Sequence, residues 1–102
     1  MPVDRASISQ LIADLRELGE LQMATPAERD SVIADCVALK ANIGLDPELA
    51  NVVPETVWHF LSDADIRFKD SRYSIVQLPA LATCLAAWER GLDFAGPETL
   101  QR

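Results

Sequence analysis

This chain contains few cysteine and histidine residues and no long apolar run, and each of these features excludes a class of site or protein. The 102 residues include two cysteines and one histidine, with no Cys-x-x-Cys or mixed Cys/His spacing, so neither a zinc centre nor a dithiol redox motif is predicted. We expect Cys36 and Cys84 to be free thiols on apolar helix faces. No apolar run approaches a membrane span, and the first residues lack the apolar core of a signal peptide. The expected protein is cytoplasmic, with no membrane, metal or cofactor.

Basic residues are also few, with nine Lys and Arg against sixteen Asp and Glu, which gives a net charge of −7. The imbalance is uneven, because residues 1–65 hold twelve acidic and four basic residues, whereas residues 66–102 hold four acidic and five basic residues. Phosphate recognition needs clustered cations, so nucleic acid and anionic membranes are disfavoured as partners. The acidic first part is compatible with a basic protein partner, although excess carboxylates can also serve only solubility.

The one concentration of cations consists of Arg67, Lys69 and Arg72, interleaved with aromatic residues. Basic and aromatic side chains together can bind single-stranded nucleic acid. Acidic residues alternate with this cluster, however, and we favour local ion pairs such as Asp65–Lys69 over a nucleic-acid site.

The four glycines are scattered, so the sequence contains neither a P-loop nor a Gly-x-Gly-x-x-Gly turn. The Gly-x-Ser-x-Gly motif of α/β-hydrolases is also absent, and neither cysteine has sequence neighbours that would activate it. We therefore assign no catalytic residue and expect a protein that is not an enzyme.

Apolar residues recur once per helical turn along most of the chain, and this periodicity predicts helices throughout. The first helix is expected over about residues 8–22. Ser7 and Gln10 form a capping-box pattern at its start. Its apolar stripe is expected to contain Ile8, Leu11, Ile12, Leu15 and Leu18.

The second helix is expected over about residues 26–43, after a short connection that makes it an antiparallel neighbour of the first. Thr25, Pro26 and Glu28 form the clearest start signal in the chain, since they combine an N-cap, a first-turn proline and a capping box. Gly44 suits a left-handed C-terminal cap. The apolar stripe is expected to contain Val32, Cys36, Leu39 and Ile43, widened by Ile33 and Val37.

The connection that follows contains Asp46-Pro47-Glu48, which predicts a single helical turn capped by Asp46. Pro54 then opens a third helix, expected over about residues 54–69. This segment is apolar around much of its circumference, a pattern that suits a central helix or one whose second face meets a partner.

The fourth helical region is expected over about residues 72–91 and ends at Gly91. Pro79 cannot donate a backbone hydrogen bond and disfavours helix at Leu78. The sequence therefore predicts a break or a kink near Pro79, without deciding between a kinked helix and two separate ones. The apolar seam of this region contains Leu78, Leu81, Leu85, Trp88 and Leu92.

Together these elements predict an all-α protein, either a compact four-helix bundle or an orthogonal helical array. We expect residues 1–102 to form one helical domain, because a chain of this length can build a single core. The end segments 1–6 and 95–102 are expected to be loosely ordered.

One polar stripe on the third predicted helix has residue types that can bind a cation. Its members recur at spacings of three and four, which places them on one helix face. Within it, His59 and Asp63 are weak candidate ligands for a divalent cation, but further ligands would have to come from another helix. The alternative is a solvated face carrying Glu55–His59 and Asp63–Arg67 pairs. The stripe consists of Glu55, His59, Asp63, Arg67 and Asp70.

Large apolar residues on the third and fourth helices are the candidate interaction residues. Tryptophan anchors interfaces well, although in a domain of this size aromatic residues more often fill the core. The candidates are Trp58, Phe60, Ile66 and Trp88.

Three functions are compatible with these patterns. The first is a small acidic interaction module that binds or neutralises a basic protein. The second is a structural homodimer through the third and fourth helices, where the small stripe of Ala80, Cys84 and Ala87 allows close approach. The third is a metal-dependent enzyme that uses His59 and Asp63.

Overall fold

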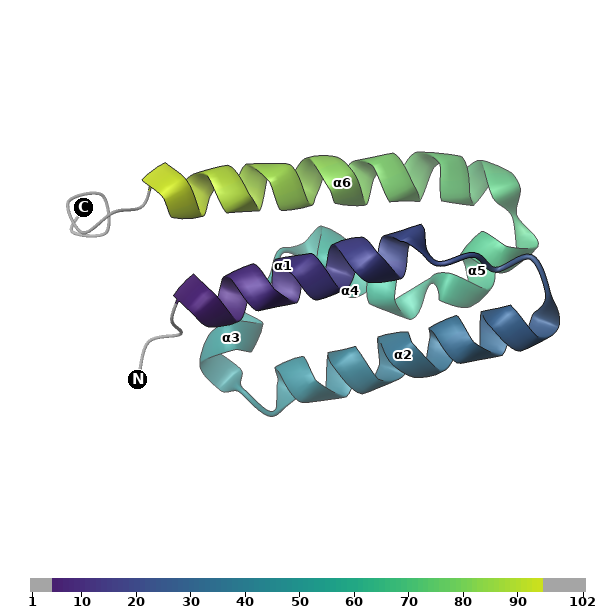
Figure 1. Ribbon diagram of the computed structural model, residues 1–102, viewed down its shortest axis with the longest axis horizontal. Coiled ribbons are helices and arrows are strands. Elements are labelled where there is room, and N and C mark those ends of the chain that lie inside the picture. The colour runs from purple at the N-terminus through teal and green to yellow at the C-terminus, as the bar shows by residue number, and fades with distance from the viewer. Residues whose placement is uncertain (1–4, 95–102) are drawn as a thin grey trace.

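The computed structural model describes residues 5–94, and all regular elements in this range are helices (Figure 1). Residues 5–94 contain no β-strand, which confirms the predicted all-α class for this part of the chain. The predicted loose segments at 1–4 and 95–102 lie outside the described residues. The helices are α1 (Arg5–Glu20), α2 (Pro26–Gly44), α3 (Pro47–Val52), α4 (Glu55–Ser62), α5 (Ala64–Lys69) and α6 (Ser71–Phe94).

The first helix begins earlier than the sequence predicted. α1 starts at Arg5, so Arg5 and Ala6 belong to the helix rather than to a loose terminus. Ser7 therefore lies inside α1, and the predicted capping box at Ser7 is wrong. Gln10 instead donates from Nε2 to Asp14 Oδ1, one turn further along, at 2.9 Å.

The start of α2 is confirmed in detail. The Glu28 backbone N–H donates to Thr25 Oγ1 at 3.1 Å, and the Thr25 N–H donates to Glu28 Oε1 at 3.1 Å. This reciprocal pair satisfies two amides that a helix start leaves unpaired. The chain reverses between Glu20 and Pro26, so α1 and α2 run antiparallel (Figure 1).

The junction between α2 and α3 differs from the predicted glycine cap. None of the described residues has a positive φ, and Gly44 is the last residue of α2 in ordinary helical geometry. Leu45 follows in the right-handed region, where its N–H donates to Ala41 O at 3.1 Å. The left-handed cap is unnecessary because the chain enters α3 almost at once. The predicted turn at Asp46 is confirmed, since its carboxylate accepts from Leu49 N at 3.2 Å.

The predicted third helix is two helices, α4 and α5, separated at Asp63. Asp63 has φ −108° and ψ 15°, outside regular helical geometry. Its carboxylate accepts hydrogen bonds from Tyr73 Oη and Gln77 Nε2 of α6. Aspartate readily exchanges helical for local or tertiary hydrogen bonding. The helix is therefore interrupted at the residue whose side chain is hydrogen-bonded to α6.

α6 continues from Ser71 through Pro79 as one helix, so the predicted alternative of two separate helices is wrong. The helix also passes Gly91 and ends at Phe94, so the predicted end at Gly91 is wrong. Packing of its seam against the core offsets the cost of an interior proline, which is about 3 kcal/mol in an isolated helix. No helix in the described range is long and apolar enough to cross a membrane.

The hydrophobic core lies around α4, which contacts α2, α5 and α6, as expected for a central helix. Leu81 and Leu85 supply the α6 side, as its seam predicted. Val37 is 60% exposed, so the prediction that it widens the apolar stripe of α2 is wrong. It lies on the flank of α2 away from α4, where no helix covers it. The buried apolar residues are Ile8, Leu11, Ile12, Leu15, Val32, Cys36, Ile43, Val53, Val57, Phe60, Leu61, Ala64, Leu81 and Leu85.

Candidate functional site

A groove runs between α1 and α2, where the two antiparallel helices touch each other only sparsely. α1 packs mainly on α6, whereas α2 packs mainly on α4 and α5. The buried stripes of both helices are thus occupied by other elements, and their adjacent flanks are left apart. Two adjoining depressions of about 470 Å³ and 290 Å³ fill this space. They share Asp14, Leu39 and Asn42 as lining residues, which makes them one continuous groove.

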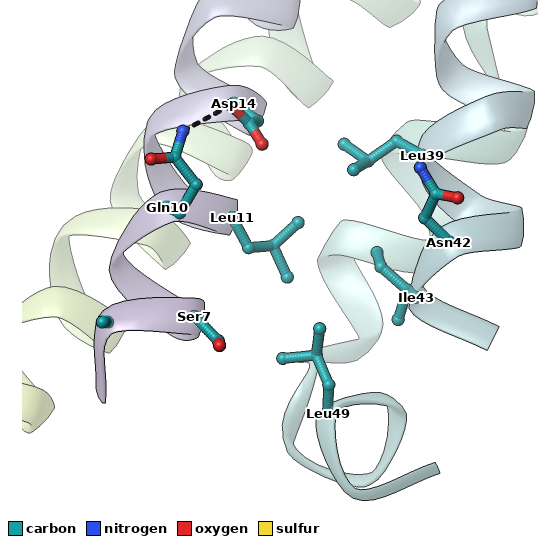
Figure 2. Close-up of a pocket in the computed structure, with 9 residues that line it drawn as sticks. Ser7, Gln10, Leu11, Asp14, Leu39, Asn42, Ile43 and Leu49 are labelled. Atoms are coloured by element: carbon teal, nitrogen blue, oxygen red, sulfur yellow. Dashed lines mark hydrogen bonds between the residues drawn. The ribbon is translucent and has the colours of Figure 1, made fainter. Parts of the chain in front are cut away.

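The floor of the groove is apolar. Figure 2 shows Leu11 of α1, Leu39 and Ile43 of α2, and Leu49 of α3 extending into the same space from three helices. Leu39 and Leu49 are only half-buried and pack against the edge of the core. Leu18 continues the apolar floor towards the α1–α2 connection. Leu11 and Ile43 are themselves buried, so the accessible apolar surface of the groove comes from the partly exposed Leu18, Leu39 and Leu49.

The rim of the groove is acidic. Asp14 and Glu17 project from α1, and Asp35 lies across from them on α2. The residues that line the two depressions include no lysine or arginine. Beyond Asp14, towards the α3 end, the rim is uncharged, with Ser7, Gln10 and Asn42 as its polar groups. An open apolar floor with carboxylates at one end can attract a cationic, partly apolar ligand.

The opposite side of the core is closed around Arg67, which is 4% exposed. Its Nη1 donates to Phe60 O and to Gln77 Oε1, each at 2.6 Å. The guanidinium also lies 4.1 Å from the centroid of the Phe60 ring. The Phe60 carbonyl is near the end of α4, where it accepts from the Asp63 N–H at 3.4 Å, and Arg67 adds a shorter hydrogen bond to it.

Two further groups extend this cluster. Gln77 Nε2 donates to Asp63 Oδ2 at 3.0 Å, which links the Arg67 cluster to the break between α4 and α5. Burial raises the pKa of the Cys36 thiol, and the neighbouring Arg67 cation offsets part of that increase. Burial lowers the pKa of Arg67, although an arginine remains a cation in proteins. A buried thiol beside a guanidinium that is hydrogen-bonded to Phe60 and Gln77 supports a structural role for these groups.

The two weak metal candidates lie in different environments. His59 is exposed on α4, and its Nε2 lies 3.3 Å from Glu55 Oε1, which confirms that predicted pair. Asp63 lies outside the helix and is bonded to α6. The expected common face is wrong, because the helix ends before Asp63 and Arg67 points into the core. The described residues contain no group of three or more His, Cys, Asp or Glu placed to hold a metal ion.

The four predicted interaction residues divide by burial. Phe60 is fully buried and contacts Arg67, so its ring is not available at the surface. Trp58 and Trp88 are half-buried and pack against the core. Ile66 remains exposed on α5.

The predicted basic cluster is also divided among separate contacts. Arg67 is buried, whereas Lys69 Nζ lies 3.0 Å from Asp65 Oδ2, which confirms that predicted ion pair. Arg72 Nε lies 3.7 Å from Asp70 Oδ1, and its side chain is 92% exposed.

Sequence reasoning did not identify the groove, although its residues carry a recognisable signal. Asp14 and Asp35 each lie four residues before a leucine, Leu18 and Leu39, at the edge of their helix's apolar stripe. On two consecutive antiparallel helices, such acidic and apolar positions can form the two sides of one surface. No protein-family model matches the chain, and searches of curated proteins and of solved structures find no significant match.

Proposed function

We propose that this protein is a non-catalytic interaction module whose α1–α2 groove binds a basic, amphipathic helical segment of a partner protein. The observation that carries this proposal is the combination of a leucine-rich floor with a rim of Asp14, Glu17 and Asp35. A helix that lays its apolar face into such a groove uses residues one turn apart as anchors. Its basic residues would then lie beside the acidic rim.

The size of α1 sets the length of the bound segment. α1 contains 16 residues, which corresponds to about 24 Å of helix at 1.5 Å per residue. A partner helix of about four turns therefore covers the groove from end to end. The charge of the whole chain, −7, adds long-range attraction for a basic partner and speeds encounter.

Fluorescence polarisation with a designed peptide tests the proposal. The probe is a labelled 16-residue peptide of leucine and lysine arranged as an amphipathic helix. The controls are a scrambled peptide of equal composition and a peptide with glutamate in place of lysine. We expect saturable binding of the amphipathic basic peptide alone, weakened as salt screens the rim carboxylates. Equal binding of the scrambled peptide would instead indicate nonspecific charge attraction.

Two charge-reversal variants separate the groove from the overall charge. Asp35→Lys changes the rim. Glu55→Lys makes the same charge change at an exposed position of α4, outside the groove. We expect Asp35→Lys to weaken peptide binding about tenfold and Glu55→Lys to change it less than about twofold. Equal losses in both variants would show that net charge, and not the groove, attracts the peptide.

A further inference from the structure

The outward face of α6 is a second unpartnered surface, and its composition is unlike that of the rest of the molecule. Residues 73–88 contain no charged side chain. Ile75 and Val76 are 70% and 71% exposed, and Pro79 is also exposed. Arg72 precedes this uncharged stretch, and Glu89, which is paired with Arg16 of α1, and Arg90 follow it. Arg72 and Arg90 lie on the same helix face, since they are 18 residues, or five turns, apart. Surface helices in solution ordinarily carry charges on the face away from the core.

This face has the features required of a ligand for the groove. The charge-free stretch is 16 residues long, and therefore spans about 24 Å, like α1. It is apolar in the middle and carries the exposed Arg72 at its first end, whereas the groove is apolar on its floor and acidic at the end of its rim that holds Asp14, Glu17 and Asp35. α6 and α2 lie on opposite sides of α1, so both surfaces are accessible on one molecule (Figure 1).

We infer that α6 of a second copy of this chain occupies the groove, which rests on the groove function proposed above. One register matches the two surfaces when this α6 lies parallel to α2. Groove positions 35, 39 and 42 of α2 and face positions 72, 76 and 79 of α6 have the same spacing of four and three. This register puts an arginine beside a rim aspartate, a valine over a floor leucine, and a proline beside an asparagine.

Pro79 also leaves a backbone hydrogen-bond acceptor at this contact. Because Pro79 has no N–H, the carbonyl of Ile75 lacks its usual helical donor. Asn42 has a side-chain amide that can donate to such a carbonyl, and it is exposed at the uncharged end of the groove. The interior proline, which weakens an isolated helix, thus supplies an acceptor at the contact.

The contact joins two different surfaces, so it is heterologous and leaves one groove and one α6 face free at the ends of each assembly. Association therefore continues beyond a dimer unless a ring closes. A symmetric antiparallel α6–α6 pair centred level with Leu81 is disfavoured, because it places Arg72 opposite Arg90.

Sedimentation of two single-surface variants and of their mixture tests the inference. Val76→Asp alters the α6 face at an exposed site, and Asp35→Lys alters the rim at an exposed site, so neither is expected to disturb the core. Wild-type protein is expected to associate between about 10 µM and 1 mM. Each variant alone is expected to associate at least tenfold more weakly. Their equimolar mixture is expected to form a one-to-one dimer, since one copy keeps an intact groove and the other an intact face.

Several outcomes would overturn the inference. A wild-type chain that remains monomeric at the highest concentration contradicts it. Association lost only in Val76→Asp and not recovered in the mixture indicates a symmetric α6 dimer. The leucine–lysine peptide distinguishes failure of this inference from failure of the groove function. If wild-type protein and Val76→Asp bind the peptide while wild-type protein stays monomeric, the groove function stands and its occupant is a different protein.

A charge exchange provides the most specific check. Arg72→Glu should weaken association about tenfold, and combining it with Asp35→Lys in the same chain should restore it. The restored chain pairs a glutamate on the face with a lysine on the rim of the next copy. Additive losses in the double variant would contradict the proposed register.

Discussion

The two sides of α2 have opposite surroundings. On the side towards α4, α5 and α6, the chain encloses Arg67 and provides its guanidinium with two short hydrogen bonds. On the side towards α1, leucines stay half-exposed beneath three carboxylates. Burying a charge is costly unless hydrogen bonds replace water, which the closed side achieves with side chains from several helices. The open side keeps its charges in water, and Leu18, Leu39 and Leu49 stay partly exposed beside them.

If the two sides of α2 differ in this way, removal of the buried Arg67 cation should cause the largest loss of stability. Arg67→Ala leaves Gln77 Oε1 without this donor, removes the shorter of the two hydrogen bonds to the Phe60 carbonyl and opens a cavity, so the free energy of unfolding should fall by about 3 kcal/mol. Urea denaturation measures this change. Arg72→Ala is the matched control, because its exposed side chain should contribute less than about 0.5 kcal/mol. Equal small losses would mean that the closed side does not depend on the Arg67 cluster.

Leucine truncation on each side gives the next largest difference. Leu85→Ala in the core should cost about 3 kcal/mol, because the deletion leaves a cavity among packed residues. Leu39→Ala in the groove should cost less than about 1 kcal/mol, because the side chain is already partly in water. Thermal and urea unfolding measure both values. Similar costs would show that the groove leucine serves the core as much as Leu85 does.

A smaller effect is expected at the start of α2, which forms one wall of the groove. Thr25→Ala removes the side-chain acceptor for the Glu28 N–H and should lower the free energy of unfolding by about 1 kcal/mol. Thr83→Ala, on the exposed face of α6, is the control and should change it by less than about 0.5 kcal/mol. An unchanged midpoint in Thr25→Ala would contradict the role of the capping box.

The smallest effect concerns the ion pair between α1 and α6. Two hydrogen bonds from Arg16, each 3.0 Å, lower the pKa of Glu89 below its ordinary value of 4.5. The stabilisation by this pair is therefore present above pH 4.5 and lost as the pH falls through the lowered pKa. An NMR titration should show the Glu89 pKa rising towards 4.5 in Arg16→Ala. A pKa that is the same in both proteins would show that the pair does not persist in solution.

Much of the helix layout follows from the sequence because its causes are local. The Thr25 capping box depends on residues three positions apart, and the buried leucines of α1 and α6 recur with the helical period. The break at Asp63 was not predictable in this way, since its carboxylate is held by Tyr73 and Gln77, ten and fourteen residues further along the chain.

The groove was beyond sequence reasoning for a related reason. The residues Leu18 and Leu39 have the pattern of ordinary core positions, and only the separation of α1 from α2 leaves them facing an open space. That separation depends on which other helices α1 and α2 pack against. The buried state of Arg67 was missed likewise, because its spacing from Asp63 predicts a surface pair on one uninterrupted helix.

Amide chemical-shift mapping with the leucine–lysine peptide tests the groove most directly. If the peptide binds in the groove, the largest shifts on titration should occur at residues 7–18 of α1 and 35–49 of α2 and α3, with much smaller shifts in α4 and α5. Shifts centred on α4 and α5, or no shifts at saturating peptide, would contradict the account.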